Sequence, residues 1–567
     1  MRPSTSRLAA CLTLLLTATM DQTTFAARGT ATRSVVRAPH GMVCAAQPLA
    51  VQVGVDVLKQ GGSAVDAAIA VNACLGLMEP TANGLGGDLF AIVWDPKTRK
   101  LAGLNASGRA PLALTPDKIP VGSDTIPLHS PYAWSVPGCA DGWFELHERY
   151  GKLPMKTLLA PAIRYAEEGF PVSPVIAENW AASVKRFGDK PGFRQVFMPG
   201  GRTPAEGEMF RNPALAKTLK LLALQGRDAY YQGAIAQELV KFSRTHGGFF
   251  ALEDFAQHRS TWDDPISTTY RGHTIWELPP NGQGLAALQM LNLLENYDLK
   301  SMGRGSADFW HVQVEAKKVA FADRARYYAD PAFATIPVAQ LLSKDYAKQR
   351  ASLIDLQRAA QTDVAGDVAA INRGGTTYLC TADANGMMVS LIQSNYTGFG
   401  SGYVVPELGF GLQNRGAQFA LAAGHPNVLA PGKRPFHTII PAFVTRDGEP
   451  LMAFGLMGGD MQPQGHVQVL VNLLDLGMNL QEAGDAIRFH HSDSSEPTGT
   501  VMTDGGILHI EDGLDPAVLE ELKRRGHRLE PESVGAYGGY QAIWRDPRTK
   551  GYVGATERRK DGCAQGY

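Results

Sequence analysis

Two threonines, Thr376 and Thr377, directly follow two glycines and open a β-rich run, Thr-Thr-Tyr-Leu-Cys-Thr. A threonine freed at the N-terminus of a chain carries a nucleophilic hydroxyl together with its own base, because an α-amine with a pKa of about 7.7–8.0 can accept the hydroxyl proton near neutral pH. Gly375 permits the strained backbone angles that a bond about to be cut requires. The same residues are also typical of a strand that starts after a flexible turn, and spacing alone favours that interpretation.

A second glycine pair, Gly458 and Gly459, separates an apolar strand at 451–456 from a helix that we expect to run from about His466 to Leu476. Backbone N–H groups at the N-terminus of a helix can stabilise a developing oxyanion. Tight packing of the strand against the helix would require the same glycines, so both interpretations stay open.

Several other catalytic motifs do not occur. The sequence contains no P-loop, no HExxH and no GxSxG motif. His490 and His491 are adjacent and point in different directions on any regular element, so we expect no metal there. The six cysteines show no metal-ligand spacing, and we expect those of the mature chain to be small buried hydrophobes, although an exported protein could oxidise a pair.

The elements around these motifs predict a mixed α/β layered domain. Helical periodicity dominates four stretches, namely residues 45–79, 155–185, 213–245 and 305–327. Beyond residue 374 the pattern changes to strands at 376–381 and 387–393, joined by a turn with the Asn-Gly signal of a hairpin. Residues 28–40 are rich in Ala, Thr, Arg and Ser, and we expect ordered structure to begin near Gly41.

The 567-residue chain is long enough for a large core, and its 44% apolar and 19% charged residues are ordinary for a soluble protein. Its 54 Lys and Arg residues balance 55 Asp and Glu residues, and no long basic stripe interrupts that balance. Nucleic acid and anionic membranes are therefore poor candidates as partners.

Residues 1–27 have the pattern of a signal peptide. Two arginines form a basic region, an apolar run covers residues 8–20, and Ala26 and Ala27 offer a small-residue cleavage site. The apolar run is shorter than the roughly 20 residues of a membrane span, which argues against an uncleaved anchor helix. We therefore expect a secreted or periplasmic protein.

Further motifs along the chain resemble those of the γ-glutamyltransferase superfamily. The resemblance covers essentially the whole mature chain, from its opening segment to its C-terminus. The motifs are Gly-Met-Val-Cys-Ala-Ala-Gln-Pro-Leu-Ala (41–50), Gly-Gly-Ser-Ala-Val-Asp-Ala-Ala (61–68), Glu-Pro-Thr-Ala-Asn-Gly-Leu-Gly-Gly (79–87), Val-Pro-Gly (136–138), Tyr-Gly-Lys-Leu-Pro (150–154), Tyr-Arg-Gly (270–272), Ala-Pro-Gly-Lys-Arg-Pro (430–435), Arg-Phe-His-His (488–491) and Asp-Gly-Cys-Ala-Gln-Gly-Tyr (561–567).

The resemblance implies an α+β fold, the four-layer αββα sandwich of the N-terminal-nucleophile hydrolases. It implies self-cleavage directly before Thr376, which would give a large fragment of residues 28–375 and a small fragment of residues 376–567 that stay associated. The hydroxyl that hydrogen-bonds the family's nucleophile falls on Ser394, a serine in place of threonine. The family's oxyanion glycines fall on the pair at 458 and 459, and no metal or organic cofactor is required.

The positions that recognise a γ-glutamyl group in the family are changed here. The arginine that grips the α-carboxylate falls on Ser107, and the aspartate that holds the α-amine falls on Gln418. A neighbouring glutamine is replaced by Arg415, whose guanidinium would favour a planar carboxylate. This pattern is similar to that of the cephalosporin-acylase-like and oxamate-amidohydrolase-like branch. The residues that we expect to bind the substrate are Arg109, Arg415, Gln418, His437 and Thr438.

We therefore predict an enzyme that hydrolyses small amides of γ-glutamyl or similar acidic acyl groups, or transfers those groups. A glutaryl-type cephalosporin acylase and an oxamate amidohydrolase are alternatives on the same fold. A catalytically inactive binding protein is an alternative of another class, against which Thr376 and the two glycines argue. For Arg109 and Arg415 a surface or subunit-bridging ion pair remains the other interpretation.

Overall fold

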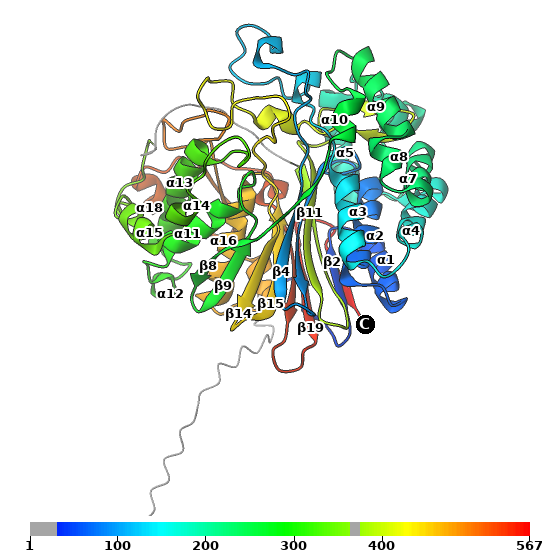
Figure 1. Cartoon of the computed structure of the whole chain (residues 1–567). Helices are drawn as coiled ribbons and strands as arrows, with labels where there is room; N and C mark the ends of the chain where they lie inside the picture. The colour runs from blue at the N-terminus through cyan, green and yellow to red at the C-terminus, as the bar shows by residue number, and fades with distance from the viewer. Residues whose placement is uncertain (1–30, 363–374) are drawn as a thin grey trace, which may run out of the picture.

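Two seven-stranded antiparallel sheets lie face to face at the centre of the molecule (Figure 1). The computed structural model describes residues 31–362 and 375–567. The first sheet, here the β10 sheet, has the strand order β20 (Cys563–Gly566), β2 (Met42–Ala45), β10 (Gly375–Ala382), β11 (Met388–Tyr396), β3 (Asp88–Asp95), β4 (Lys100–Ala106) and β7 (Thr261–Asp263). The second, the β15 sheet, has the order β1 (Val36–Ala38), β19 (Tyr552–Thr556), β18 (Gly539–Arg545), β15 (Glu449–Met457), β14 (Ala442–Arg446), β9 (His273–Glu277) and β8 (Ile266–Tyr270).

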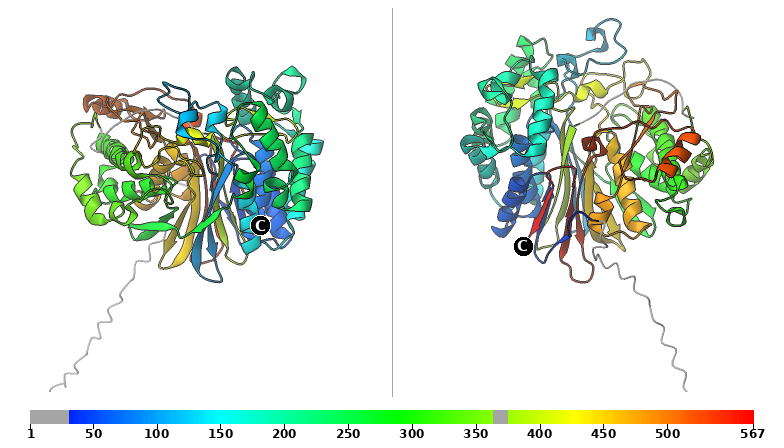
Figure 2. Two further views of the ribbon diagram at one scale, coloured as in Figure 1. Left: turned by 45° about the horizontal axis from the view of Figure 1, so that its top comes forward. Right: turned by 180° about the vertical axis from the view of Figure 1, so that it is seen from behind.

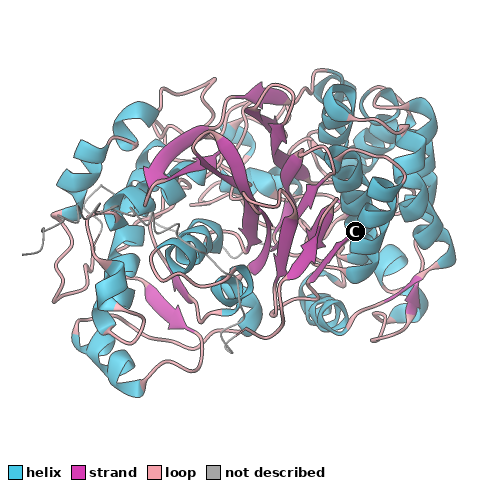
Figure 3. Cartoon of the chain, turned by 90° about the horizontal axis from the view of Figure 1, so that it is seen from below, coloured by secondary structure: helices cyan, strands magenta, loops and turns pink. Residues whose placement is uncertain are grey.

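Helices cover the outer face of each sheet, so that four layers result, and views from other directions show the same order (Figure 2 and Figure 3). The β10 sheet packs against α1 (Pro48–Lys59), α2 (Ala64–Met78), α3 (Cys139–Tyr150), α4 (Met155–Glu168), α5 (Pro174–Phe187), α7 (Pro213–Gln225), α9 (Ala234–Thr245) and α10 (Leu252–Ala256). The β15 sheet packs against α11 (Gly284–Leu294), α13 (Ala307–Tyr327), α16 (Met461–Leu474), α17 (Leu480–Asp485) and α18 (Pro516–Arg524). The predicted αββα sandwich is therefore confirmed.

Shorter elements occupy the connections between these layers. They are α6 (Phe193–Phe197), α8 (Asp228–Tyr231), α12 (Leu299–Met302), α14 (Val338–Leu341), α15 (Lys344–Ala351), β5 (Phe170–Pro171), β6 (Met209–Phe210), β12 (Val404–Val405), β13 (Phe410–Gly411), β16 (Phe489–Ser492) and β17 (Ile507–Ile510).

Side chains alternate along β10, and the alternation decides which layer each one contacts. Leu379 lies in the core beneath the helices, whereas Tyr378 and Cys380 lie in the core between the two sheets. Gly455 on β15 leaves room for the Tyr378 ring, because a Cβ there would lie 2.5 Å from a ring carbon. The even-numbered positions of β10 thus face the β15 sheet.

Two predicted boundaries were wrong. The helix expected from about His466 begins at Met461, because Pro463 falls in its first turn, where proline is tolerated, and Gly465 lets the helix approach β15 closely. Ordered structure begins before Gly41, since β1 pairs with β19 at the edge of the β15 sheet. That pairing joins distant parts of the sequence, and the local composition gives no sign of it.

Each sheet contains strands from both sides of residue 375, and these strands pair directly with one another. In the β10 sheet, β10 pairs with β2, and β11 pairs with β3. In the β15 sheet, β14 pairs with β9, and β1 pairs with β19. A break before Thr376 would therefore leave these hydrogen-bond ladders intact and the two fragments joined.

Among the described residues, no helix is long and apolar enough to cross a membrane. The predicted signal peptide lies outside the described residues. The five described cysteines are free, and four of them are buried, namely Cys44, Cys74, Cys139 and Cys380.

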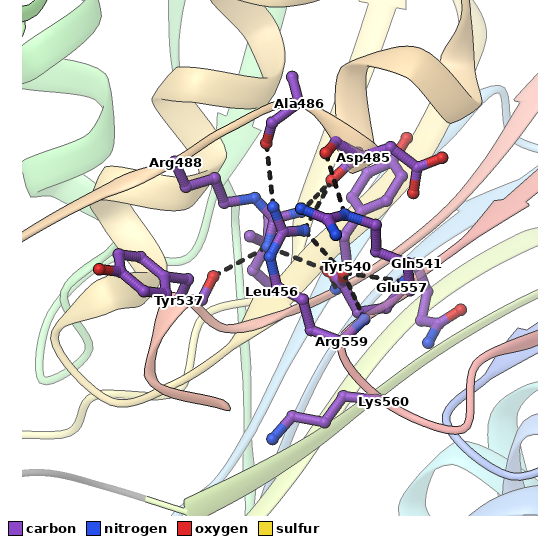
Figure 4. Close-up of polar contacts among 12 residues, drawn as sticks. Leu456, Asp485, Ala486, Arg488, Tyr537, Tyr540, Gln541, Glu557, Arg559 and Lys560 are labelled. Atoms are coloured by element: carbon purple, nitrogen blue, oxygen red, sulfur yellow. Dashed lines mark hydrogen bonds and ion pairs between the residues drawn. The ribbon is translucent and has the colours of Figure 1, made fainter. Parts of the chain in front are cut away.

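A buried ion-pair network fixes the end of the β15 sheet next to α17 (Figure 4). Glu557 lies 3.0 Å from Arg488 and 2.8 Å from Arg559, and all three side chains are buried. Burial alone would raise the pKa of Glu557, but the two arginines and two backbone amides hold it at about 2. Lys560, which follows Arg559 in the sequence, points away from this network (Figure 4).

Replacing Glu557 by glutamine leaves two buried guanidinium groups with less compensating charge, so we expect a loss of about 3–5 kcal/mol in stability. Because the pKa of Glu557 is lower in the folded than in the unfolded chain, its contribution is present above about pH 4.5 and is lost as the pH falls towards 2. Chemical unfolding at pH 7 and pH 3 measures both effects. Glu520→Gln, which breaks an exposed pair with Lys523, is the control. Equal stability of the two variants at pH 7 would contradict the prediction.

Candidate active site

Thr376 lies at the start of β10, where the strand reaches the edge of the sandwich, and its side chain is 3% exposed. The pairing register with β11 shifts between Gly375 and Thr377, so the ladder is irregular where the chain would be cut. The Thr376 hydroxyl donates to Ser394 Oγ at 3.3 Å. The predicted nucleophile and its predicted hydroxyl partner are therefore in contact.

Ser394 is held in turn by a buried cation. Arg415 Nη2 donates to Ser394 Oγ at 3.0 Å, and Nη1 donates to Thr438 Oγ1 at 2.8 Å. The guanidinium lies 4.4 Å from the centre of the Tyr396 ring, and the backbone of Tyr396 has a φ of 81°, unusual for a residue with a side chain. Burial lowers the pKa of Arg415 to about 10, so it remains charged at neutral pH. The predicted nucleophile thus lies two hydrogen bonds from a buried positive charge.

Gly458 and Gly459 follow the end of β15, which faces the start of β10 across the sandwich. Their φ angles are 126° and 65°, in the region that favours glycine. Among the described residues neither amide donates to a protein acceptor. Gly458 and Thr376 line one cavity of about 300 Å³. The arrangement brings the predicted nucleophile and the glycine turn that begins with Gly458 to the same space, as acyl transfer requires.

One buried glutamine ties the glycine turn to the wall behind the nucleophile. Gln283 Nε2 donates to Gly459 O at 2.8 Å and to Thr438 O at 2.7 Å. Its Oε1 accepts from Arg324, which is also buried and pairs with Glu496. Gln283 therefore fixes the position of Gly459 relative to Thr438, which accepts a hydrogen bond from Arg415. Gln283 was not among the residues predicted for the site.

Three charged residues line the cavity with Thr376, namely Glu79, Arg186 and Lys560. Glu79 accepts from the Thr377 hydroxyl at 2.6 Å. Burial raises the pKa of Glu79 to about 7, against the lowering effects of that hydrogen bond and of Lys560. In the sequence, Glu79 occurred only as part of a family motif and was not predicted to belong to the site. Its buried position at the end of α2 raises its pKa and places it against Thr377.

Two of the expected substrate-binding residues are engaged inside the protein. Gln418 Oε1 accepts from the Tyr396 hydroxyl at 2.6 Å. His437 Nε2 donates to Asp88 at 3.0 Å, and burial, followed by the charge of Arg415, lowers the pKa of His437 to about 3. His437 is therefore neutral at physiological pH.

The structure brings Arg415, Gln418, His437 and Thr438 together, but as a buried layer behind Ser394 and outside the lining of the Thr376 cavity. Arg109 is not part of this group, since it lines a separate cavity. The cations that do line the Thr376 cavity, Arg186 and Lys560, were not predicted, because nothing in their local sequence distinguishes them from surface residues.

A four-layer αββα sandwich with a hydroxyl nucleophile at the start of a central strand and glycine amides opposite defines an N-terminal-nucleophile hydrolase. The family model described as Gamma-glutamyltranspeptidase matches residues 50–567. The chain belongs to the γ-glutamyltranspeptidase family.

Known relatives agree with this assignment. The glutathione hydrolase-like YwrD proenzyme of Bacillus subtilis is 38% identical over 94% of this chain and 98% of its own length. The oxamate amidohydrolase proenzyme of Klebsiella pneumoniae is 35% identical over 93% of this chain and 98% of its own. The crystal structure of a cephalosporin acylase from Bacillus halodurans superposes with a TM-score of 0.88 and 42% identity, over 96% of this chain and 98% of that one. The predicted superfamily and enzyme class, a self-processing amidohydrolase, are confirmed.

Gln283→Ala removes the donors to Gly459 and Thr438, so the glycine turn loses its fixed position. We expect kcat for amide hydrolysis to fall about tenfold to hundredfold, with KM nearly unchanged. Steady-state kinetics separate the two constants. Gln289→Ala removes another buried glutamine, which bonds Asp323 and Tyr328 on the far side of α11, and serves as the control. A similar fall in kcat for both variants would show that Gln283 acts only through general stability.

Proposed function

We propose that the chain cuts itself between Gly375 and Thr376 and then hydrolyses amides with Thr376 as the nucleophile. The observation that carries this proposal is the Thr376 hydroxyl, which contacts Ser394 and shares a cavity with Gly458. Cleavage turns the amide nitrogen of Thr376 into an amine, so that base and nucleophile then belong to one residue. The products are a large fragment of residues 28–375 and a small fragment of residues 376–567.

In each catalytic cycle the Thr376 amine takes the proton of its own hydroxyl, and Oγ attacks the amide carbon. The N–H groups of Gly458 and Gly459 stabilise the oxyanion. The C–N bond breaks as the ammonium returns its proton to the departing amine, leaving an ester on Oγ. Water, deprotonated by the amine, hydrolyses this ester and releases the acid, whereas an amine in place of water would give acyl transfer.

The acyl group of the proposed substrate is acidic and lacks an α-ammonium. Arg186 and Lys560 line the cavity, and Arg415 adds a positive charge close behind Ser394. An ammonium group would meet these cations, and the aspartate that relatives of the γ-glutamyl type place at position 418 is here a neutral glutamine. Glutaryl-type amides and oxamate fit this description better than γ-glutamyl amides.

We also propose that the chain is exported and loses its leader after residue 26 or 27, which makes it a secreted or periplasmic enzyme. The basic, apolar and small-residue regions of residues 1–27 support this proposal.

Purified wild-type protein should run as two fragments, and sequencing of the smaller one should begin Thr-Thr-Tyr-Leu. Thr376→Ala should give an uncut, inactive chain, because nucleophile and base are both lost. Thr377→Ala, which removes only the hydrogen bond to Glu79, is the control and should still be cut. A different N-terminus, or an uncut chain with full activity, would exclude Thr376 as the nucleophile.

Two substrates that differ only in the α-ammonium test the acyl preference, namely glutaryl p-nitroanilide and γ-glutamyl p-nitroanilide. We expect kcat/KM to be at least about tenfold higher for the glutaryl compound, equivalent to ~1.4 kcal/mol. Arg186→Gln and Lys560→Gln should narrow this ratio, whereas Arg244→Gln, on the distant face of α9, should leave it unchanged. Equal or better hydrolysis of the γ-glutamyl compound would refute the proposed acyl preference without bearing on the nucleophile.

A further inference from the structure

A second cavity, of about 260 Å³, lies apart from the cavity of the nucleophile, and the two share no lining residue. It lies beside α10, next to the segment that follows β4. The polar side chains that line it belong to Arg109, Asp254, Gln257, His258 and Arg259.

Two guanidinium groups meet at one wall of this cavity. Arg109 Nη1 and Arg434 Nη2 point at the same carbonyl oxygen, that of Arg259, at 3.4 and 3.2 Å. The other hydrogen-bond partners of the Arg434 guanidinium are neutral, namely Ser107 O at 3.1 Å and Thr261 Oγ1 at 3.4 Å. Burial and then the charge of Arg109 lower the pKa of Arg434 to about 10. A pair of like charges is therefore held close together with little compensation.

No carboxylate in the described part of the chain forms a salt bridge with Arg109 or Arg434. Asp330 accepts from the backbone amide of Arg434 at 2.8 Å, and Asp330, Asp263 and Asp88 raise the pKa of the guanidinium without forming an ion pair with it. Asp254, which lines the cavity, directs its two oxygens to the amides of Leu112 and Ala251, at 2.8 and 2.7 Å. Arg109 is only partly buried, and among the described residues its guanidinium forms one hydrogen bond, the contact of 3.4 Å with Arg259 O, so its other donors are available to an anion from solution.

His258 completes the wall. Its side chain is buried, and its ring lies flat against Tyr231 at 5.1 Å. Neither ring nitrogen has a hydrogen-bond partner among the described residues, since Nε2 is 3.6 Å from Asp141. Buried polar groups are normally hydrogen-bonded, so two ring nitrogens without a partner are unusual next to a cavity.

We propose that this cavity binds the carboxylate group of a small organic acid, with Arg109 as the principal contact, Arg434 behind it and His258 beside it. The planar fork of Arg109 matches a carboxylate through two parallel hydrogen bonds. The site is independent of the nucleophile, and the proposal does not rest on the proposed reaction.

Binding should also take up protons at mildly acidic pH. Burial lowers the pKa of His258 to about 4 against the raising effect of Asp141, while Arg434 and Arg109 lower it further and Asp88 raises it. Asp141 is itself paired with Arg227. A bound carboxylate adds a negative charge next to the ring and raises the pKa of His258. The affinity should therefore increase as the pH falls from 7 to 5.

Calorimetric titration of the uncut Thr376→Ala chain with succinate tests the site. Arg109→Gln should weaken succinate binding at least tenfold. Arg109→Lys keeps the charge but not the planar fork, so its affinity should lie between those of the parent and Arg109→Gln. Arg244→Gln, which changes an exposed side chain of α9, should bind succinate as tightly as the parent does. In two buffers of different ionisation enthalpy at pH 6, the parent should take up more protons per succinate bound than His258→Gln does, because the contribution of succinate itself is common to both.

Several results would overturn the proposal. Succinate could fail to bind, or it could bind Arg109→Gln as tightly as the parent. Loss of binding in Lys560→Gln together with normal binding in Arg109→Gln would place the ligand in the nucleophile cavity instead. Tighter binding of inorganic phosphate than of succinate would contradict the assignment to a carboxylate.

Discussion

The Arg415 side chain carries a buried positive charge into hydrogen-bond distance of Ser394, and the geometry of the active site depends on this interaction. The charge is held by hydroxyl groups and by the face of the Tyr396 ring. Ser394 accepts from both Arg415 and Thr376, so its position follows from the guanidinium and in turn orients the hydroxyl of the proposed nucleophile. A guanidinium this close also stabilises negative charge that develops at the Thr376 oxygen, because screening by water is weak in a buried site.

The sandwich supplies what this interaction requires. The start of β10 and the end of β15 lie at one edge of the two sheets, so a nucleophile from one sheet meets glycine amides from the other. Gln283 and Arg324 connect that glycine turn to the layer behind Ser394. Because strands from before and after residue 375 pair within both sheets, a cut before Thr376 would leave the scaffold that holds the site together.

Much of the fold and the core of the site could be predicted from the sequence. Thr376, Ser394 and the two glycines lie at the ends of strands that the local sequence pattern predicts. Their roles were assigned from the family resemblance. The environment of Arg415 could not be predicted, because Arg415 lies in a short 3-10 helix whose neighbours come from distant segments of the chain. Gln283 contacts Gly459 across 176 residues, and Arg186 and Lys560 reach the cavity from different layers. Arg109 was assigned to the substrate from its position in a motif, but the path of the chain after β4 takes it to another cavity.

The central claim is that Thr376 Oγ forms the covalent intermediate. Reaction of the cleaved enzyme with an activated glutaryl ester, an acid quench after a short time, proteolysis and tandem mass spectrometry would locate the acyl group. The account predicts an added glutaryl mass on the peptide that begins with Thr376, as an ester that hydroxylamine removes. An adduct on Ser394 or on any residue of the large fragment, or turnover without an acyl adduct at Thr376, would contradict it.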